Sequence, residues 1–187
     1  IVMKVLRIIM VILFVIMANQ PSFAAEDFVK GSAQFYSKSS DSLSFVKKFL
    51  LYQGFRDVIT NSFQKMGKSA ELFWQNYDEK FEESFIELKK AIDEKYEVVD
   101  GEPTKDKARY YRAIRFKRLN ELRKFGNLDR VIESYVVKRM SRSSRDPNMR
   151  FIDIDAKINE VALSKLYFEF IKKDQDFKLK KLHVRVE

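Results

Sequence analysis

The sequence has no cysteine and only one histidine among its 187 residues. Without thiols the chain cannot form a disulfide, a cysteine-rich zinc site, a thiol nucleophile or a lipoprotein anchor, and one imidazole cannot build a multi-histidine metal centre. A Ser-His-Asp triad would have to use His183, which alternates with Leu182 and Val184 as in a solvent-facing strand. We therefore expect no enzyme, no metal and no cofactor.

Long hydrophobic runs are also scarce. The apolar run from Ile8 to Met17 follows Lys4 and Arg7 and precedes small residues that end at Ala25. Its ten residues fall short of the roughly 20 that a transmembrane anchor needs. The layout is instead typical of a cleavable secretory signal over residues 1–24. We expect a periplasmic or secreted protein.

Positive charge is unevenly distributed. The formal net charge is +9 at pH 7, and residues 105–150 hold 15 Lys or Arg against 5 Asp or Glu. Such a block can meet nucleic acid, anionic lipid headgroups or an acidic protein, or it can be an ordinary solvated face. Because export separates the chain from nucleic acid, we expect a lipid, an anionic membrane surface or an acidic protein partner, and no nucleic acid.

Apolar spacing predicts four amphipathic helices between residues 41 and 140. The first begins at Asp41 or Ser42 and ends at Gly67, with Gly54 as an irregularity that can bend or divide it. The second, which carries an aromatic seam, begins at Ser69. We expect a third over 104–125 and, after a Gly-Asn break, a fourth over 128–140.

The third predicted helix carries an anomaly. Arg115 and Arg118 fall inside its apolar face, which Tyr111 shares. Since an unpaired charge in an interior costs several kcal/mol, three explanations remain open. The arginine stems can snorkel along apolar surface, the guanidinium groups can pair with acids of the second helix such as Glu82 or Glu87, or they can bind an anionic headgroup.

The hydrophobic period changes near residue 150. Residues 152–158 alternate apolar and polar, which predicts a half-buried strand. Similar alternation over 165–170 and 177–186 predicts a three-stranded antiparallel meander. Residues 163–171 also fit helical spacing with Asn159 as a cap, so a helix is the alternative there.

The run from Leu166 to Val184 resembles the closing hairpin of nuclear transport factor 2-like domains and of the periplasmic phospholipid carriers of the lipid-asymmetry pathway: an aromatic strand, a charged turn and a closing strand. Residues 73–96 are similar to a helix of those carriers. The resemblance implies helices packed on a curved sheet around an apolar cavity, which the 17 Phe, 8 Tyr and 6 Met can line. The alternative is an ordinary dense aromatic core.

Together these patterns predict one α+β domain over residues 25–187, with helices over 41–140 followed by a small three-stranded antiparallel sheet over 150–187. The expected function is an exported, non-enzymatic binding protein for an apolar or anionic amphiphilic, lipid-like ligand. Its expected binding residues are Arg115, Arg118, Tyr111 and Arg112. The alternative is an envelope interaction or structural module that uses the basic face.

Overall fold

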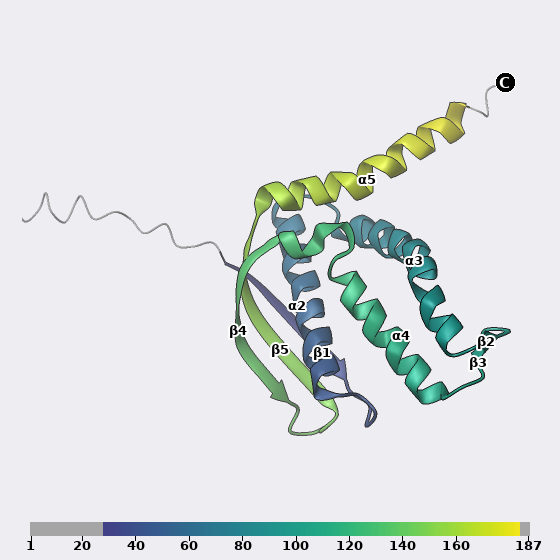
Figure 1. The fold of residues 1–187 in the computed structure, drawn as a ribbon. Coiled ribbons are helices and arrows are strands. Elements are labelled where there is room, and N and C mark those ends of the chain that lie inside the picture. The colour runs from purple at the N-terminus through teal and green to yellow at the C-terminus, as the bar shows by residue number, and fades with distance from the viewer. Residues whose placement is uncertain (1–27, 184–187) are drawn as a thin grey trace, which may run out of the picture.

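The computed structural model describes residues 28–183, with side chains through Ile171, as an α+β fold (Figure 1). The predicted signal segment, residues 1–24, lies outside the described residues. The elements in chain order are β1 (Val29–Tyr36), α2 (Leu43–Lys65), α3 (Ala70–Lys95), β2 (Val98–Val99), β3 (Glu102–Pro103), α4 (Lys107–Leu122), the short 3-10 helix η1 (Phe125–Arg130), β4 (Ile132–Arg142), β5 (Met149–Ile158) and α5 (Glu160–His183).

The three long strands form one antiparallel sheet in the order β1-β5-β4. Strand β5 is central, and its Ile154 lies opposite Gly31 of β1 on one side and Val137 of β4 on the other. The strand predicted over 152–158 is confirmed within β5, where Ile152 and Ile154 are almost completely buried. The sheet therefore joins the beginning of the fold to its last third, and its first strand precedes the helices.

Helix α2 lies directly on the sheet because glycine is present at the contact. A Cβ atom placed on Gly31 would lie 2.5 Å from the backbone oxygen of Gly54 and 2.5 Å from Cγ2 of Val58. Only a residue without a side chain permits this approach. The helix is continuous through Gly54, so the division considered from the sequence does not occur. Its predicted start is confirmed, since the Ser42 hydroxyl accepts a hydrogen bond from the Phe45 backbone N–H at 3.2 Å.

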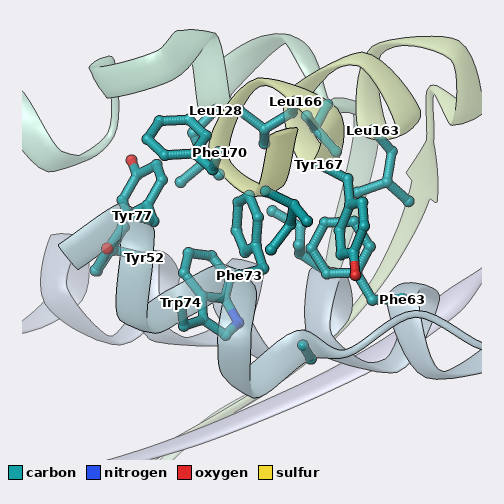
Figure 2. Packing of buried hydrophobic residues seen from close by; sticks show 14 of the residues in the cluster. Tyr52, Phe63, Phe73, Trp74, Tyr77, Leu128, Leu163, Leu166, Tyr167 and Phe170 are labelled. Atoms are coloured by element: carbon teal, nitrogen blue, oxygen red, sulfur yellow. The ribbon is translucent and has the colours of Figure 1, made fainter. Parts of the chain in front are cut away.

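A mostly aromatic cluster joins α2, α3, η1 and α5 on another face of α2 (Figure 2). Phe73 of α3 lies at its centre, with its ring centroid 4.8 Å from that of Phe63 and 5.6 Å from that of Phe170. The Tyr77 hydroxyl donates to the backbone oxygen of Leu122 at 2.8 Å. The predicted second helix is confirmed, and its aromatic seam is core.

Helices α3 and α4 pack against each other and reach away from the sheet, with β2 and β3 between them (Figure 1). Helix α4 begins after Asp106, whose carboxylate accepts from the Arg109 backbone N–H at 3.1 Å, and not after Thr104 as predicted. Its most buried aromatic side chain is Tyr110, whereas Tyr111 is exposed. Leu119 of the predicted apolar face is buried, so the difference lies at the start of the helix.

The helix predicted over 128–140 is wrong, because residues 132–142 form strand β4. The pairing of β4 with β5 slips by one residue at Glu133 and again at Lys138. Each β-bulge adds a residue, so the next side chain on the same face comes three positions later instead of two. The apolar residues on the α2 side of the sheet therefore follow at intervals that imitate a helix: Ile132, Tyr135, Val137 and Met140.

The strands predicted over 165–170 and 177–186 are also wrong as far as His183, because residues 160–183 form helix α5. The helical alternative is confirmed: the Asn159 side-chain oxygen accepts from the Ala162 backbone N–H at 2.9 Å. Buried Leu163, Leu166 and Phe170 follow the helical period. The hairpin implied by the resemblance to lipid carriers therefore does not form within the described residues, and His183 ends a helix.

None of the helices in the described region is both long enough and apolar enough to cross a membrane.

The contact between β1 and α2 gives a direct test of the fold. We expect Gly31→Ala to lower the free energy of unfolding by about 1–3 kcal/mol, because the new methyl group has to push α2 away from the sheet. Urea denaturation followed by circular dichroism measures this change. The control is Gln34→Ala, at an exposed position of the same strand. A Gly31→Ala protein as stable as the wild type would contradict the close contact.

Candidate functional site

Strand β4 lies at one edge of the sheet, and α2 leaves its apolar side chains uncovered. Val137 and Met140 lie opposite Ile154 and Ile152 of β5, and residues directly opposite each other share one face of a sheet. The two isoleucines are at most 1% exposed, whereas Val137 is 40% and Met140 42% exposed. Helix α2 therefore covers β1 and β5 but leaves this face of β4 exposed.

A row of α2 side chains lies across from the exposed side chains of β4. Its members are spaced four residues apart: Leu43, Lys47, Leu51 and Phe55. Phe55 contacts Tyr135 of β4 edge to face, with ring centroids 5.0 Å apart. We call the space between this row and the exposed side chains of β4 the β4 groove.

Two pockets occupy the two ends of the β4 groove. The pocket beside η1 has a volume of about 360 Å³ and is lined mainly by Tyr52, Phe55, Leu128, Ile132 and Tyr135. Burial raises the pKa of Tyr52, so its hydroxyl stays uncharged at neutral pH. The pocket beside the β4–β5 hairpin has a volume of about 410 Å³ and includes Leu43, Val46, Leu50 and Met140. Both pockets thus offer apolar contact.

The two ends differ in charge. Lys47, Arg142 and Arg150 line the hairpin pocket, and no acidic residue does. Lys47 and Arg142 are exposed and have no ion pair within the described residues. Nη1 of Arg150 donates to the backbone oxygen of Pro147 at 2.5 Å, which holds this guanidinium at the pocket. The lining of the pocket at the other end includes Arg123 together with the acidic residues Asp129 and Glu133. An anionic group is therefore favoured beside the hairpin.

The other face of the sheet carries paired charges. Nε of Arg139 lies 2.7 Å from Oδ2 of Asp153, and Nζ of Lys138 lies 3.5 Å from Oδ2 of Asp155. Each pair joins β4 to the central strand. These carboxylates are thus occupied by neighbouring cations, and the unpaired positive charge of β4 lies at Arg142.

The predicted binding residues of α4 lie elsewhere. Nη1 of Arg115 is 2.5 Å from Oδ1 of Asp41, whose side chain is 2% exposed, and the guanidinium carbon lies 4.4 Å from the Phe45 ring centroid. Nη1 of Arg118 lies 2.7 Å from Oε2 of Glu82 on α3. Pairing with the second predicted helix, one of the three explanations, therefore describes Arg118, while Arg115 pairs with Asp41, next to the N-cap residue of α2.

The other two predicted residues are exposed and are not brought into a pocket with the arginines. Tyr111 is 43% exposed, with Nζ of Lys107 5.9 Å from its ring centroid. Arg112 is exposed and has no ion pair in the part of the chain that the structure describes. The four residues thus lie along α4 without forming a common concave site among the described pockets.

The residues of the β4 groove were missed. Arg142 lies within the basic block, just after the helix predicted over 128–140, and the β-bulges of β4 give that stretch three-residue steps that resemble a helical period. A usable signal was present at β1, where Val29, Gly31 and Ala33 alternate with polar residues. We did not predict a strand there, although this alternation indicates one before the helices. With β1 at one edge of the sheet, β4 lies at the other.

Comparison of the chain with protein-family models, with curated proteins and with solved structures gives no match. The function therefore has to be inferred from the geometry of the chain itself.

The contact between Asp41 and Arg115 predicts a pH dependence of stability. Burial by itself raises the pKa of Asp41, but hydrogen bonds from Arg115 and from the Lys38 backbone N–H outweigh it and leave the pKa below its ordinary 3.8. The pair therefore stabilises the fold fully above about pH 4, and this stabilisation is lost as the pH falls through the lowered pKa.

We expect Asp41→Asn to lower the free energy of unfolding by roughly 2 kcal/mol at pH 7 and to approach the wild-type value in acid. Urea denaturation at a series of pH values measures both. Asp100→Asn, in an exposed turn, is the control. A difference between Asp41→Asn and wild type that did not change with pH would exclude the ionised pair as its cause.

Proposed function

We propose that this chain is an exported, non-enzymatic binding protein whose ligand lies in the β4 groove and has an apolar part and an anionic group. The observation that supports the proposal is the exposed apolar row of β4 leading to Arg142. Val137 and Met140 lie on the same face of the sheet as the buried Ile154 and Ile152, yet they are exposed. Exposed apolar rows with a polar rim are typical of binding surfaces.

The chemistry of the groove supports a ligand with two unlike ends. Covering apolar surface contributes about 25 cal/mol per Å², which favours an apolar segment between Tyr135 and Met140. A carboxylate or phosphate beside Arg142 and Arg150 gains charge-assisted hydrogen bonds. The volumes of the two pockets, about 360 and 410 Å³, fall within the range of ligand sites.

The proposed ligand lies beside α2 and not beneath it. Val58 of α2 and Ile152 of the sheet are both 0% exposed, and the backbones meet at Gly31. The interior space that an enclosed lipid would need is thus taken by side chains at this contact. Binding at the open groove thus takes the place of the enclosed cavity that the resemblance implies.

A second candidate function is an envelope protein-interaction module. The free backbone edge of β4 favours it, because backbone N–H and C=O groups are recognised by another polypeptide. Export to the periplasm or the medium is part of both proposals and rests on the sequence of residues 1–24. Under either one, we expect no nucleic-acid partner.

The anionic, aromatic dye 1-anilinonaphthalene-8-sulfonate tests the groove, since it combines an apolar body with a sulfonate. We expect Val137→Gln and Arg142→Gln each to weaken dye binding about five- to tenfold, because one removes apolar contact and the other a charge-assisted hydrogen bond. Fluorescence titration measures the dissociation constants. The matched control is Val136→Gln: Val136 is 51% exposed and lies opposite Asp155, on the other face of β4.

Circular dichroism and urea denaturation show whether each variant remains folded. Equal dye affinity in wild type, Val137→Gln and Arg142→Gln would place the binding site elsewhere and overturn the proposal.

A further inference from the structure

The two edges of the sheet are treated differently by the rest of the fold. At β1, the Asp57 carboxylate of α2 accepts a hydrogen bond from the Ser32 backbone N–H at 2.8 Å. The Asn61 side-chain amide donates to the Lys30 backbone oxygen at 2.9 Å. Polar side chains of α2 therefore occupy backbone groups of β1 that another strand would need.

The edge of β4 has no such cover. Within the described residues no side chain or loop hydrogen-bonds to the free edge of β4, and its positions from Glu133 to Met140 are all exposed. An unpaired edge strand presents a row of backbone donors and acceptors and is a template for another strand. The fold thus closes one edge of the sheet and leaves the longer strand open.

We propose that the edge of β4 binds an extended polypeptide segment of a partner by strand addition, with acidic residues of that segment beside Arg142. Alternate side chains of the segment enter the β4 groove, while its backbone pairs with β4. This inference rests on the proposed function, because it names the occupant of the same groove.

The spacing of the pockets fits an extended chain. The η1 pocket reaches Tyr135, and the hairpin pocket extends from Met140 to Arg142. Tyr135 and Arg142 are thus about 23 Å apart along a strand that rises roughly 3.3 Å per residue. An extended segment of about eight residues reaches both. A lipid tail can follow the groove, but it leaves the backbone groups of β4 to water.

Charge selects the chemistry of the segment. Lys47, Arg142 and Arg150 surround the hairpin pocket without an acidic neighbour in its lining, which favours aspartate or glutamate at that end of the partner. A second copy of this chain is disfavoured as the occupant. Its own β4 carries three basic residues and only one acidic residue, so it brings less negative charge to the hairpin pocket than an acidic segment does.

Synthetic peptides test strand addition directly. The probe is a labelled ten-residue peptide that alternates Val and Thr between a pair of Asp residues at one end and a pair of Lys residues at the other, made in both chain directions. Each is also made with N-methyl groups on the odd or on the even residues, which removes alternate backbone donors and keeps the side chains. Fluorescence anisotropy measures binding.

We expect the peptide to bind in only one chain direction. For that peptide, one N-methylation pattern should weaken the affinity at least about tenfold and the other should change it less than about twofold, because only alternate amides face β4. In the chain, Val137→Gln should weaken binding and Val136→Gln should not. Arg142→Gln should reduce the preference for this peptide over one with Lys at both ends.

Three outcomes overturn the inference. The first is equal weakening by both N-methylation patterns. The second is binding of phosphatidylglycerol vesicles through the groove together with no binding of any peptide. The third is a dimer, seen by analytical ultracentrifugation, that Val137→Gln dissociates. If the dye still depends on Val137 and Arg142 in these cases, the proposed function stands without strand addition.

Discussion

The approach of α2 to the sheet at Gly31 is the constraint on which the rest of the structure depends. Because β1 has no side chain there, the helix lies against the β1 side of the sheet, with the Gly54 backbone at the contact. A helix with side chains is only about 10 Å wide and neighbouring strands are nearly 5 Å apart. One helix displaced toward β1 therefore covers two strands and leaves the third bare. The β4 groove follows from this displacement.

The aromatic cluster fixes where β4 begins. Leu128 and Val131 are nearly fully buried among side chains of α2, α3 and α5, and the Val131 backbone oxygen accepts from the Asn159 N–H at 2.9 Å. Both ends of the β4–β5 hairpin are thus attached to the core at η1, while the hairpin turn lies at the far end of the groove. The apolar pocket lies at the attached end and the basic pocket at the far end. The two ends of the groove therefore differ in chemistry, and a ligand with unlike ends fits in one orientation.

Sequence periodicity predicted the elements that keep one regular period. The helices after Ser42 and Ser69 and the strand around Ile154 are confirmed because their buried side chains repeat at 3.6 or 2 residues. Strand β4 was misassigned because its bulges produce three-residue steps, and α5 because a short aromatic run fits both periods. The candidate site could not be predicted, since it depends on which strand α2 leaves uncovered, a tertiary property that no local pattern encodes.

Several basic residues of the block 105–150 form ion pairs within the fold and so are not free to bind a partner. Arg115, Arg118 and Arg139 each have a carboxylate within 3 Å, so their charges are largely neutralised and hold elements of the fold together. These pairs use several of the nearby acids, and Arg142 and Lys47 are among the cations that have no ion pair within the described residues. Exposed ion pairs contribute little to the stability of the fold. An unpaired cation beside an apolar row binds an anionic group more strongly when the apolar part of the same ligand shields both charges from water. We therefore expect an anionic ligand group at this end of β4, although the positive charge of the block is spread over nearly fifty residues.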